Sequence, residues 1–240
     1  MLKTFVICLL TAATLAAPAA GADETAVRQE FQVKFPDMKV ETVNKMPFPG
    51  IYEVLFNGQV VYTDEKVTFL FTGNLFDLRS QPPRNLTQDR NNRMIASTLA
   101  SSTDMAVKRV KGNGKRTLYT FEDPNCGFCK KLQGELVKLN DVTIYTFLLP
   151  IVAPPDSVEK SKAVWCSKDR GKAWDELMSK GTVPAAGAKN CDTPIAKSIE
   201  LARRFGVNGT PAVYLVDGQH IGGYLPRDKI EQALNSVAPK

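Results

Sequence analysis

The sequence contains a single histidine, His220, and only five cysteines among its 240 residues. A zinc site that uses one close pair of cysteines usually needs a second close pair of cysteine or histidine ligands. The cysteines that could supply it, Cys166 and Cys191, stand far apart in the sequence. This shortage of ligands weighs against a structural zinc site, and we expect no bound metal.

Long apolar runs are missing beyond the first 22 residues, so no later segment could cross a bilayer. The N-terminus has the pattern of a secretory signal: a charge at Lys3, an apolar region from Phe5 and an A-x-A cleavage site at 20–22. We therefore expect residues 1–22 to be a signal peptide that is removed, and the mature chain to be exported and soluble.

Extended basic segments are also absent, although the net charge is +6. Basic residues alternate with acidic ones, apart from short clusters at 108–111 and 115–116. A nucleic-acid-binding protein would show a basic face together with a recognisable binding module. We interpret the two clusters as solvated surface and expect no nucleic-acid partner.

Two cysteines, Cys126 and Cys129, follow an apolar run at 117–121 that is typical of a strand. They open a helical pattern that places Cys129 on the same face as three leucines. Cys126 then lies at the first helical turn, where free N–H groups and the helix dipole favour an anion. This position stabilises the thiolate, which is the form that attacks a disulfide.

Cys129 lies one helical turn further on, where it can attack a mixed disulfide formed at Cys126. The spacing therefore predicts a redox dithiol, with Cys126 as the nucleophile and Cys129 as the resolving thiol. Two alternatives stay open: half of a zinc site, and a purely structural disulfide between the two residues.

Removing the signal also removes Cys8, which leaves four cysteines in a compartment where disulfides persist. With Cys126 and Cys129 assigned to redox chemistry, Cys166 and Cys191 remain to pair with each other. We interpret this pair as a structural disulfide. Closing its loop would stabilise the fold by about 3–4 kcal/mol.

Residues 23–85 have the pattern of a small β-rich domain. A short amphipathic helix is expected at 23–35, a strand at 40–43, and a hairpin around Asn57-Gly58, because Asn-Gly between apolar runs is a strong hairpin signal. A further strand is expected at 67–71. Such a meander is too small to bury much apolar surface alone, so we expect it to have a partner.

The remaining chain is expected to form a polar connector helix, 86–108, and a larger α/β domain, 109–240. Thr87 is the candidate cap of the connector helix. In the larger domain, helical patterns cover 156–180 and 194–205, the second starting near Asp192 or Thr193 as its cap.

The motif Cys126-Gly127-Phe128-Cys129, followed by Thr210-Pro211 before a strand, resembles the thioredoxin superfamily. In that family a cis-proline loop lies beside the dithiol and pairs with the substrate backbone, so the resemblance implies a cis bond before Pro211. Thr120 stands where thioredoxin has a buried acid, six residues before the first cysteine, which weakens the case for a carboxylate proton acceptor for Cys129.

The wider layout is similar to periplasmic disulfide isomerases of the DsbC/DsbG type, and the second cysteine pair favours the DsbC side. Where DsbC-type proteins commonly have Gly-Tyr, this motif has Gly127-Phe128. The resemblance implies an α+β protein: a small N-terminal β-meander dimerisation domain, a connector helix and a C-terminal thioredoxin-like α/β domain. It also implies that Gly127, Phe128, Thr210 and Pro211 form the substrate-binding part of the site.

The function implied by the resemblance is isomerisation and reduction of wrong disulfides in exported proteins, with chaperone activity and without a cofactor. The implied partners are misfolded disulfide-containing proteins in the periplasm, a membrane reductant of the DsbD type and a second copy of the chain. Two alternatives are a dithiol oxidase of the DsbA kind, against which the N-terminal meander argues, and a holdase chaperone with a secondary redox role.

Overall fold

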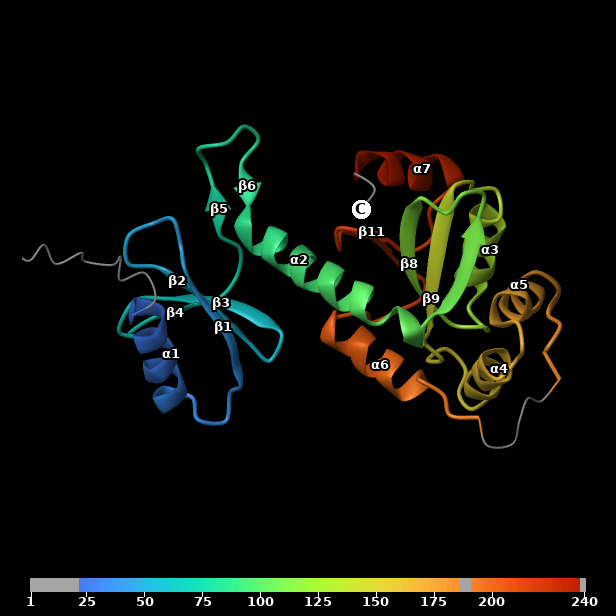
Figure 1. Cartoon of the computed structure of the whole chain (residues 1–240), viewed down its shortest axis with the longest axis horizontal. Coiled ribbons are helices and arrows are strands. Elements are labelled where there is room, and N and C mark those ends of the chain that lie inside the picture. The colour runs from blue at the N-terminus through green and yellow to red at the C-terminus, as the bar shows by residue number, and fades with distance from the viewer. Residues whose placement is uncertain (1–21, 186–190, 238–240) are drawn as a thin grey trace, which may run out of the picture. The chain divides into compact units, whose positions relative to one another are not determined.

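The computed structural model describes residues 22–185 and 191–237, and Figure 1 shows its elements. The signal expected at 1–22 lies outside the described residues except for Ala22. The chain divides into two compact units, Met1–Gly73 and Asn74–Lys240. None of the helices in the described ranges combines the length and the apolar character needed to cross a bilayer.

From residue 22 onward, the first unit consists of one helix and a four-stranded antiparallel sheet with the strand order β1-β2-β3-β4. Its elements are α1 (Ala22–Lys34), β1 (Val40–Lys45), β2 (Tyr52–Phe56), β3 (Gln59–Thr63) and β4 (Leu70–Phe71). The predicted hairpin is confirmed, because Asn57 and Gly58 both have positive φ, 47° and 76°, as a tight two-residue turn requires.

The apolar core of the first unit lies between α1 and the sheet. Val27 and Phe31 of α1 are fully buried and belong to one cluster with Tyr52, Val54 and Phe56 of β2. The strand expected at 67–71 is reduced to the two residues of β4. A carboxylate oxygen of Asp64 accepts hydrogen bonds from the backbone N–H groups of Thr68 and Phe69, which holds this segment in a turn.

The second unit begins with a short hairpin and a long helix. These are β5 (Phe76–Asp77), β6 (Arg84–Asn85) and α2 (Leu86–Ser101). The expected cap was wrong: the side chain of Asn85 accepts a 3.0 Å hydrogen bond from the N–H of Gln88. Thr87 instead accepts a 2.9 Å bond from the N–H of Leu75, which ties the start of α2 to the residue before β5.

A five-stranded sheet is the centre of the second unit, with the strand order β11-β10-β8-β9-β7. Its strands are β7 (Val107–Lys111), β8 (Arg116–Glu122), β9 (Val142–Leu148), β10 (Ala212–Leu215) and β11 (His220–Gly222). Only the β8–β9 pair is parallel among these ladders. The sequence did not predict β7, which follows a short 3₁₀ helix, η1 (Thr103–Met105).

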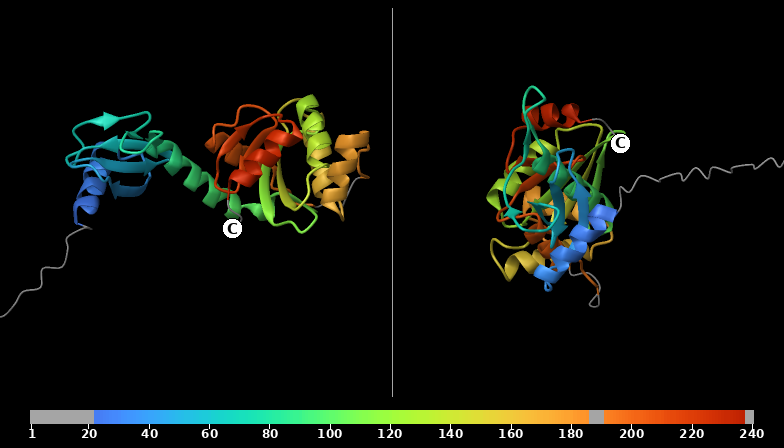
Figure 2. Two further views of the ribbon diagram at one scale, coloured as in Figure 1. Left: turned by 90° about the horizontal axis from the view of Figure 1, so that it is seen from above. Right: turned by 90° about the vertical axis from the view of Figure 1, so that its left-hand side faces the viewer.

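Helices cover both faces of this sheet (Figures 1 and 2). They are α3 (Gly127–Leu136), α4 (Asp156–Trp165), α5 (Arg170–Lys180), α6 (Ile195–Arg204) and α7 (Arg227–Ser236). On one face, Leu132 of α3 and Ile230 of α7 pack with Leu118. On the other face, Leu99 of α2 and Leu201 of α6 pack in one cluster with aromatic residues of β8 and β9.

The helix expected at 156–180 is two helices, because the chain turns between α4 and α5. Asp169 caps α5 by accepting a 2.9 Å hydrogen bond from the N–H of Lys172. The cap expected for α6 was also wrong, since that helix begins after Pro194 without a side-chain cap. The carbonyl of Asp192 instead accepts a 3.1 Å bond from the indole N–H of Trp165.

Helix α2 packs tightly against Gly218, in the turn between β10 and β11 of the same unit. A Cβ atom at Gly218 would lie 1.9 Å from the carbonyl oxygen of Asn92 in α2, and the residue has a φ of +86°. We predict that Gly218→Ala lowers the free energy of unfolding by about 2–4 kcal/mol, because strain and a backbone clash combine.

Gly181→Ala is the matched control, since Gly181 also has positive φ but has open space around its Cβ position. It should lose only the conformational part, about 1 kcal/mol. Denaturant unfolding of both variants measures the difference. Equal losses would show that the approach of α2 to this turn contributes nothing.

Candidate active site

Cys126 is placed by the loop that joins β8 to α3 and acts as the N-cap of α3. Its Sγ accepts a 3.2 Å hydrogen bond from the backbone N–H of Cys129, and its own N–H donates to the carbonyl of Asp123 at 3.1 Å. The sulfur therefore accepts a hydrogen bond from a free N–H group in the first turn of α3.

The loop before Cys126 is fixed by the buried carboxylate of Asp123. It accepts hydrogen bonds from the N–H of Asn125 at 2.7 Å, the hydroxyl of Ser157 at 2.9 Å and the N–H of Val152 at 2.8 Å. These contacts tie the loop to the start of α4 and to the segment after β9. Sequence reasoning gave Asp123 no role.

Thr210 and Pro211 lie beside the dithiol, although Thr210 is 84 residues from Cys126 in the sequence. The peptide bond between them is cis, as predicted. The Sγ of Cys126 lies 3.2 Å from the carbonyl oxygen of Thr210, to which the thiol donates. The structure thus brings the CxxC motif and the proline loop into one site.

Apolar side chains are exposed close to the dithiol. Phe128, inside the motif, is 58% exposed, and Lys131 lies 5.1 Å from the centre of its ring. Ile151 and Val152 are also exposed, on the segment whose backbone Asp123 holds. Gly127 has open space at its Cβ position, so this glycine leaves room at the N-terminus of α3.

Cys129 is fully buried, in the same apolar cluster as Trp174 and Leu148. Burial raises the pKa of the Cys129 thiol strongly, and the charge of the nearby Glu122 raises it further. The two cysteines are both thiols in the structure. A buried thiol with a raised pKa needs a proton acceptor before it can attack.

Glu122 is a carboxyl group whose charge acts on Cys129, so it is the candidate proton acceptor. It was not identified from the sequence. Glu122 is fully buried and accepts hydrogen bonds from Gln133 Nε2 at 2.7 and 2.9 Å and from the hydroxyl of Thr120 at 2.7 Å. Arg109 forms an ion pair with it at 3.8 Å. Burial raises the pKa of Glu122, while Arg109 and the hydrogen bonds act in the opposite direction.

Thr120 weakens the case for a carboxylate proton acceptor at its own position, but a buried acid is present near Cys129 at another position of β8. Alternate residues of a strand point to the same face, so residues 120 and 122 of β8 share one side of the sheet. Glu122 comes two positions after Thr120 and lies on the same face of the sheet. The alternation of side chains along a strand could therefore have identified Glu122 from the sequence.

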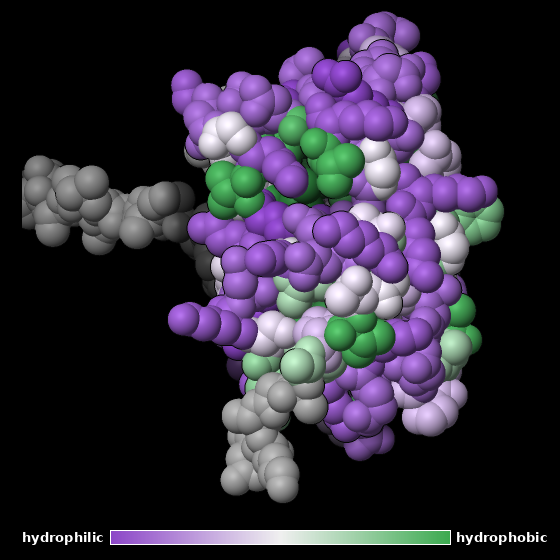
Figure 3. All heavy atoms as spheres, turned by 90° about the vertical axis from the view of Figure 1, so that its right-hand side faces the viewer, coloured by the Kyte–Doolittle hydropathy of each residue, from purple (hydrophilic) through white to green (hydrophobic). Residues whose placement is uncertain are grey.

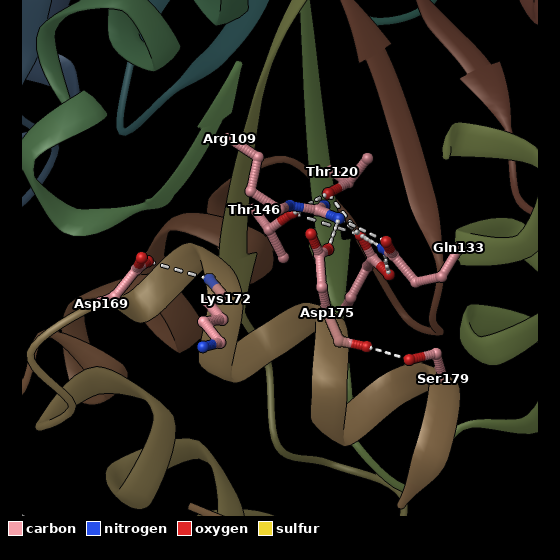
Figure 4. A network of polar contacts seen from close by, with 9 residues as sticks. Arg109, Thr120, Gln133, Thr146, Asp169, Lys172, Asp175 and Ser179 are labelled. Atoms are coloured by element: carbon pink, nitrogen blue, oxygen red, sulfur yellow. Dashed lines mark hydrogen bonds and ion pairs between the residues drawn. The ribbon is translucent and has the colours of Figure 1, made fainter. Parts of the chain in front are cut away.

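The basic cluster at 108–111 also needs correction, because Arg109 is not part of the solvated surface. β7 alternates between buried and exposed residues, and Arg109 is 5% exposed. Its guanidinium donates to Gln133, Thr146 and Asp175 (Figure 4). Within the described residues, no three histidine, cysteine, aspartate or glutamate side chains gather as metal ligands would.

Cys166 and Cys191 form a disulfide, with Sγ atoms 2.11 Å apart. Both lie against the cluster that contains Cys126, Cys129 and Trp165.

The surface over α4 and α5 is mostly hydrophilic, with small apolar patches (Figure 3).

Two family models match the chain. The thioredoxin-like domain covers residues 103–238, and the disulfide bond isomerase protein N-terminal domain covers residues 18–88. The probable thiol:disulfide interchange protein DsbC of Bordetella pertussis is 38% identical over 210 residues, which are 87% of this chain and 73% of the relative. The thiol:disulfide interchange protein DsbC of Escherichia coli K12 is 31% identical over 221 residues, 90% of this chain and 89% of the relative.

Among solved structures, a disulfide interchange protein from Neisseria gonorrhoeae matches with a TM-score of 0.54 and 41% identity. The match covers 58% of this chain and 99% of that chain.

We predict that Cys166→Ala/Cys191→Ala lowers the free energy of unfolding by about 3–4 kcal/mol, because the open loop gains entropy in the unfolded chain. The residues are 25 apart in sequence. Denaturant unfolding under non-reducing conditions measures the loss, and thiol exchange at Cys126 should persist in the folded variant. A loss below about 1 kcal/mol would contradict a stabilising role.

Proposed function

The chain belongs to the DsbC family of thiol:disulfide interchange proteins, and we propose that Cys126 is its nucleophile and Cys129 its resolving thiol. The protein is a disulfide isomerase and oxidoreductase with a thioredoxin-like domain. The observation that supports the two roles is the position of Cys126 at the N-terminus of α3, with Cys129 fully buried behind it.

The exchange begins when the thiolate of Cys126 attacks one sulfur of a wrong disulfide. A mixed disulfide forms and the other substrate sulfur leaves as a thiolate. If a second substrate thiolate then attacks the mixed disulfide, the substrate is isomerised and Cys126 is released without net oxidation. If Cys129 attacks, the substrate is reduced and a Cys126–Cys129 disulfide forms.

Resolution by Cys129 requires the loss of its proton, and Glu122 is the group that accepts it. The raised pKa of Glu122 brings its basicity closer to that of a thiol, and its charge already acts on Cys129. General-base catalysis is most efficient when the pKa of the base lies near the working pH. Because burial raises the pKa of Glu122, it makes this carboxylate a stronger base for the proton of Cys129.

Substrate binding is assigned to the surface around the dithiol. The cis Thr210–Pro211 bond lies beside Cys126, and Phe128, Ile151 and Val152 are exposed apolar side chains. An extended segment of a misfolded protein exposes backbone groups and apolar side chains of the kind that such a surface contacts. Gly127 and Phe128 contribute the part of this surface that belongs to the motif.

Residues 23–85 join two copies of the chain, and the contact is centred on the sheet of the first unit. β4 is an edge strand of the four-stranded sheet, and Phe69, Leu70 and Phe71 are exposed there. An exposed apolar edge strand is a template for pairing with another chain, and a two-fold axis makes such pairing self-complementary. A dimer offers two dithiols to one substrate, which holds it through several exchanges.

The protein works in the periplasm after removal of residues 1–22, with a membrane reductant of the DsbD type keeping the dithiol reduced. The DsbC relatives and the N-terminal domain match support this assignment over a dithiol oxidase of the DsbA kind. A chaperone activity accompanies it. A cysteine-free substrate whose folding yield rises with the Cys126→Ser variant would separate chaperone activity from exchange.

We predict that Cys126→Ser abolishes isomerase and reductase activity, because the attacking thiolate is lost. Cys129→Ser should instead accumulate mixed disulfides with substrate, because internal resolution is lost. Non-reducing electrophoresis and mass spectrometry of the trapped species measure both. If Cys129 proves to be the thiol that alkylates first at neutral pH, the two roles are assigned the wrong way round.

We predict that Phe71→Asp, at the edge strand of the first unit, makes the mature chain monomeric. It should retain reduction of a simple disulfide and lose most isomerase activity on a protein with several disulfides. Val33→Asp is the control, because Val33 is also exposed and apolar but lies on α1. Sedimentation decides the matter: an unchanged oligomeric state in both variants would refute the interface.

A further inference from the structure

The buried guanidinium of Arg109 connects the carboxylate below the dithiol to a carboxylate at the surface. Its side chain is 3% exposed. One end forms the 3.8 Å ion pair with Glu122 and donates to Thr146 at 2.8 Å. The other donates to Asp175 of α5 at 3.0 Å and to Gln133 (Figure 4).

Asp175 is the member of this chain of contacts that reaches solvent. Its side chain is 34% exposed, whereas that of Glu122 is completely buried. It lines a hollow of about 550 Å³ together with Gln133 and Met178. Figure 4 shows Asp175 pointing from α5 toward the guanidinium.

One cation is thus shared by two carboxylates. An arginine stays charged at all working pH values. The charges on the two carboxylates therefore decide how strongly Arg109 stabilises the ionised form of Glu122. The other groups that face Glu122 are the neutral side chains of Thr120 on β8, Thr146 on β9 and Gln133 on α3, and the thiol of Cys129. Asp175 is the only additional anion in contact with Arg109 among the described residues.

We propose that Asp175 is a positioning residue for the resolving step: by sharing Arg109 with Glu122, it keeps Glu122 basic enough to take the proton of Cys129. Without the charge of Asp175, the whole of the guanidinium charge acts on Glu122 and stabilises its ionised form. A nearby opposite charge lowers the pKa of an acid. Glu122 then becomes a weaker base.

The step itself is balanced within the protein and its substrate, and it rests on the roles proposed for Cys126 and Cys129. The proton of the Cys129 thiol moves to a carboxylate oxygen of Glu122. The Cys129 sulfur then forms a bond to the Cys126 sulfur, the bond between Cys126 and the substrate breaks, and the substrate leaves as a thiolate. The two cysteines are oxidised and the substrate disulfide is reduced.

The test compares Asp175→Asn with Glu176→Gln in the full mature chain. Glu176 is the next residue on α5 and carries the same charge, but it is not among the hydrogen-bond partners of Arg109 in the described residues. Oxidised glutathione is the probe. Attack by Cys126 is followed in a Cys129→Ser background, and resolution is followed as release of the second glutathione in a single turnover.

The resolving step should rise with pH as Glu122 loses its proton. In Asp175→Asn this rise should move to lower pH by about half a unit to one unit, because the pKa of Glu122 falls. The maximum rate should fall by roughly 2–5-fold, because a weaker base accepts the proton less readily. Glu176→Gln should change neither quantity, and Asp175→Glu should restore both.

The decisive arm repeats Asp175→Asn in a Glu122→Gln background, where it should have no further effect on the pH profile. An equal shift with and without Glu122 would overturn the proposal, as would equal behaviour of Asp175→Asn and Glu176→Gln. Asp175→Ser replaces the asparagine variant if that variant does not fold. Failure of Cys129→Ser to accumulate the glutathione mixed disulfide would instead refute the proposed function, independently of Asp175.

Discussion

The burial of Glu122 beneath the dithiol is the constraint on which the catalytic unit depends. Removing a carboxylate from water costs on the order of several kcal/mol unless charge and hydrogen bonds replace the solvent. The replacements come from three other elements: Arg109 on β7, Gln133 on α3 and Thr146 on β9. Each must be in place for the carboxylate to be stable there, so the order β8-β9-β7 and the position of α3 are coupled to the site. Conversely, a site with such a network loses little energy to reorganisation when the proton moves.

Local patterns were enough to predict the CxxC pair, the hairpin at Asn57-Gly58 and the helix that begins after Cys126. Each of these features is determined by residues that are neighbours in the sequence. The Cys166–Cys191 pairing could be inferred by elimination. The strand β7 was not predicted, because its basic residues Lys108, Arg109 and Lys111 resemble a basic surface cluster. What makes Arg109 internal is its partners, which lie 24, 37 and 66 residues away. No local propensity contains that information.

The buried acid shows the opposite case, in which the information was present in a short stretch. Thr120 and Glu122 share a face of β8, so an acid two residues after the expected position occupies the same side of the sheet. The hydroxyl of Thr120 even donates to that carboxylate. Its ionisation, by contrast, depends on the long-range contacts of Arg109. The position of the acid was therefore readable from the sequence, whereas its chemistry was not.

An isomerase has to balance two competing reactions at the mixed disulfide. If Cys129 resolves it too quickly, substrates are reduced before their own thiols can attack; if it resolves too slowly, misfolded substrates stay trapped. Burial raises the pKa of the Cys129 thiol, which would slow resolution, and in the proposed mechanism Glu122 accelerates it by accepting the proton. The basicity of Glu122 depends in turn on how much of the Arg109 charge it receives, which Asp175 reduces. In the proposed mechanism, the division of one guanidinium between a buried and a surface carboxylate sets the time that a substrate has to rearrange its disulfides.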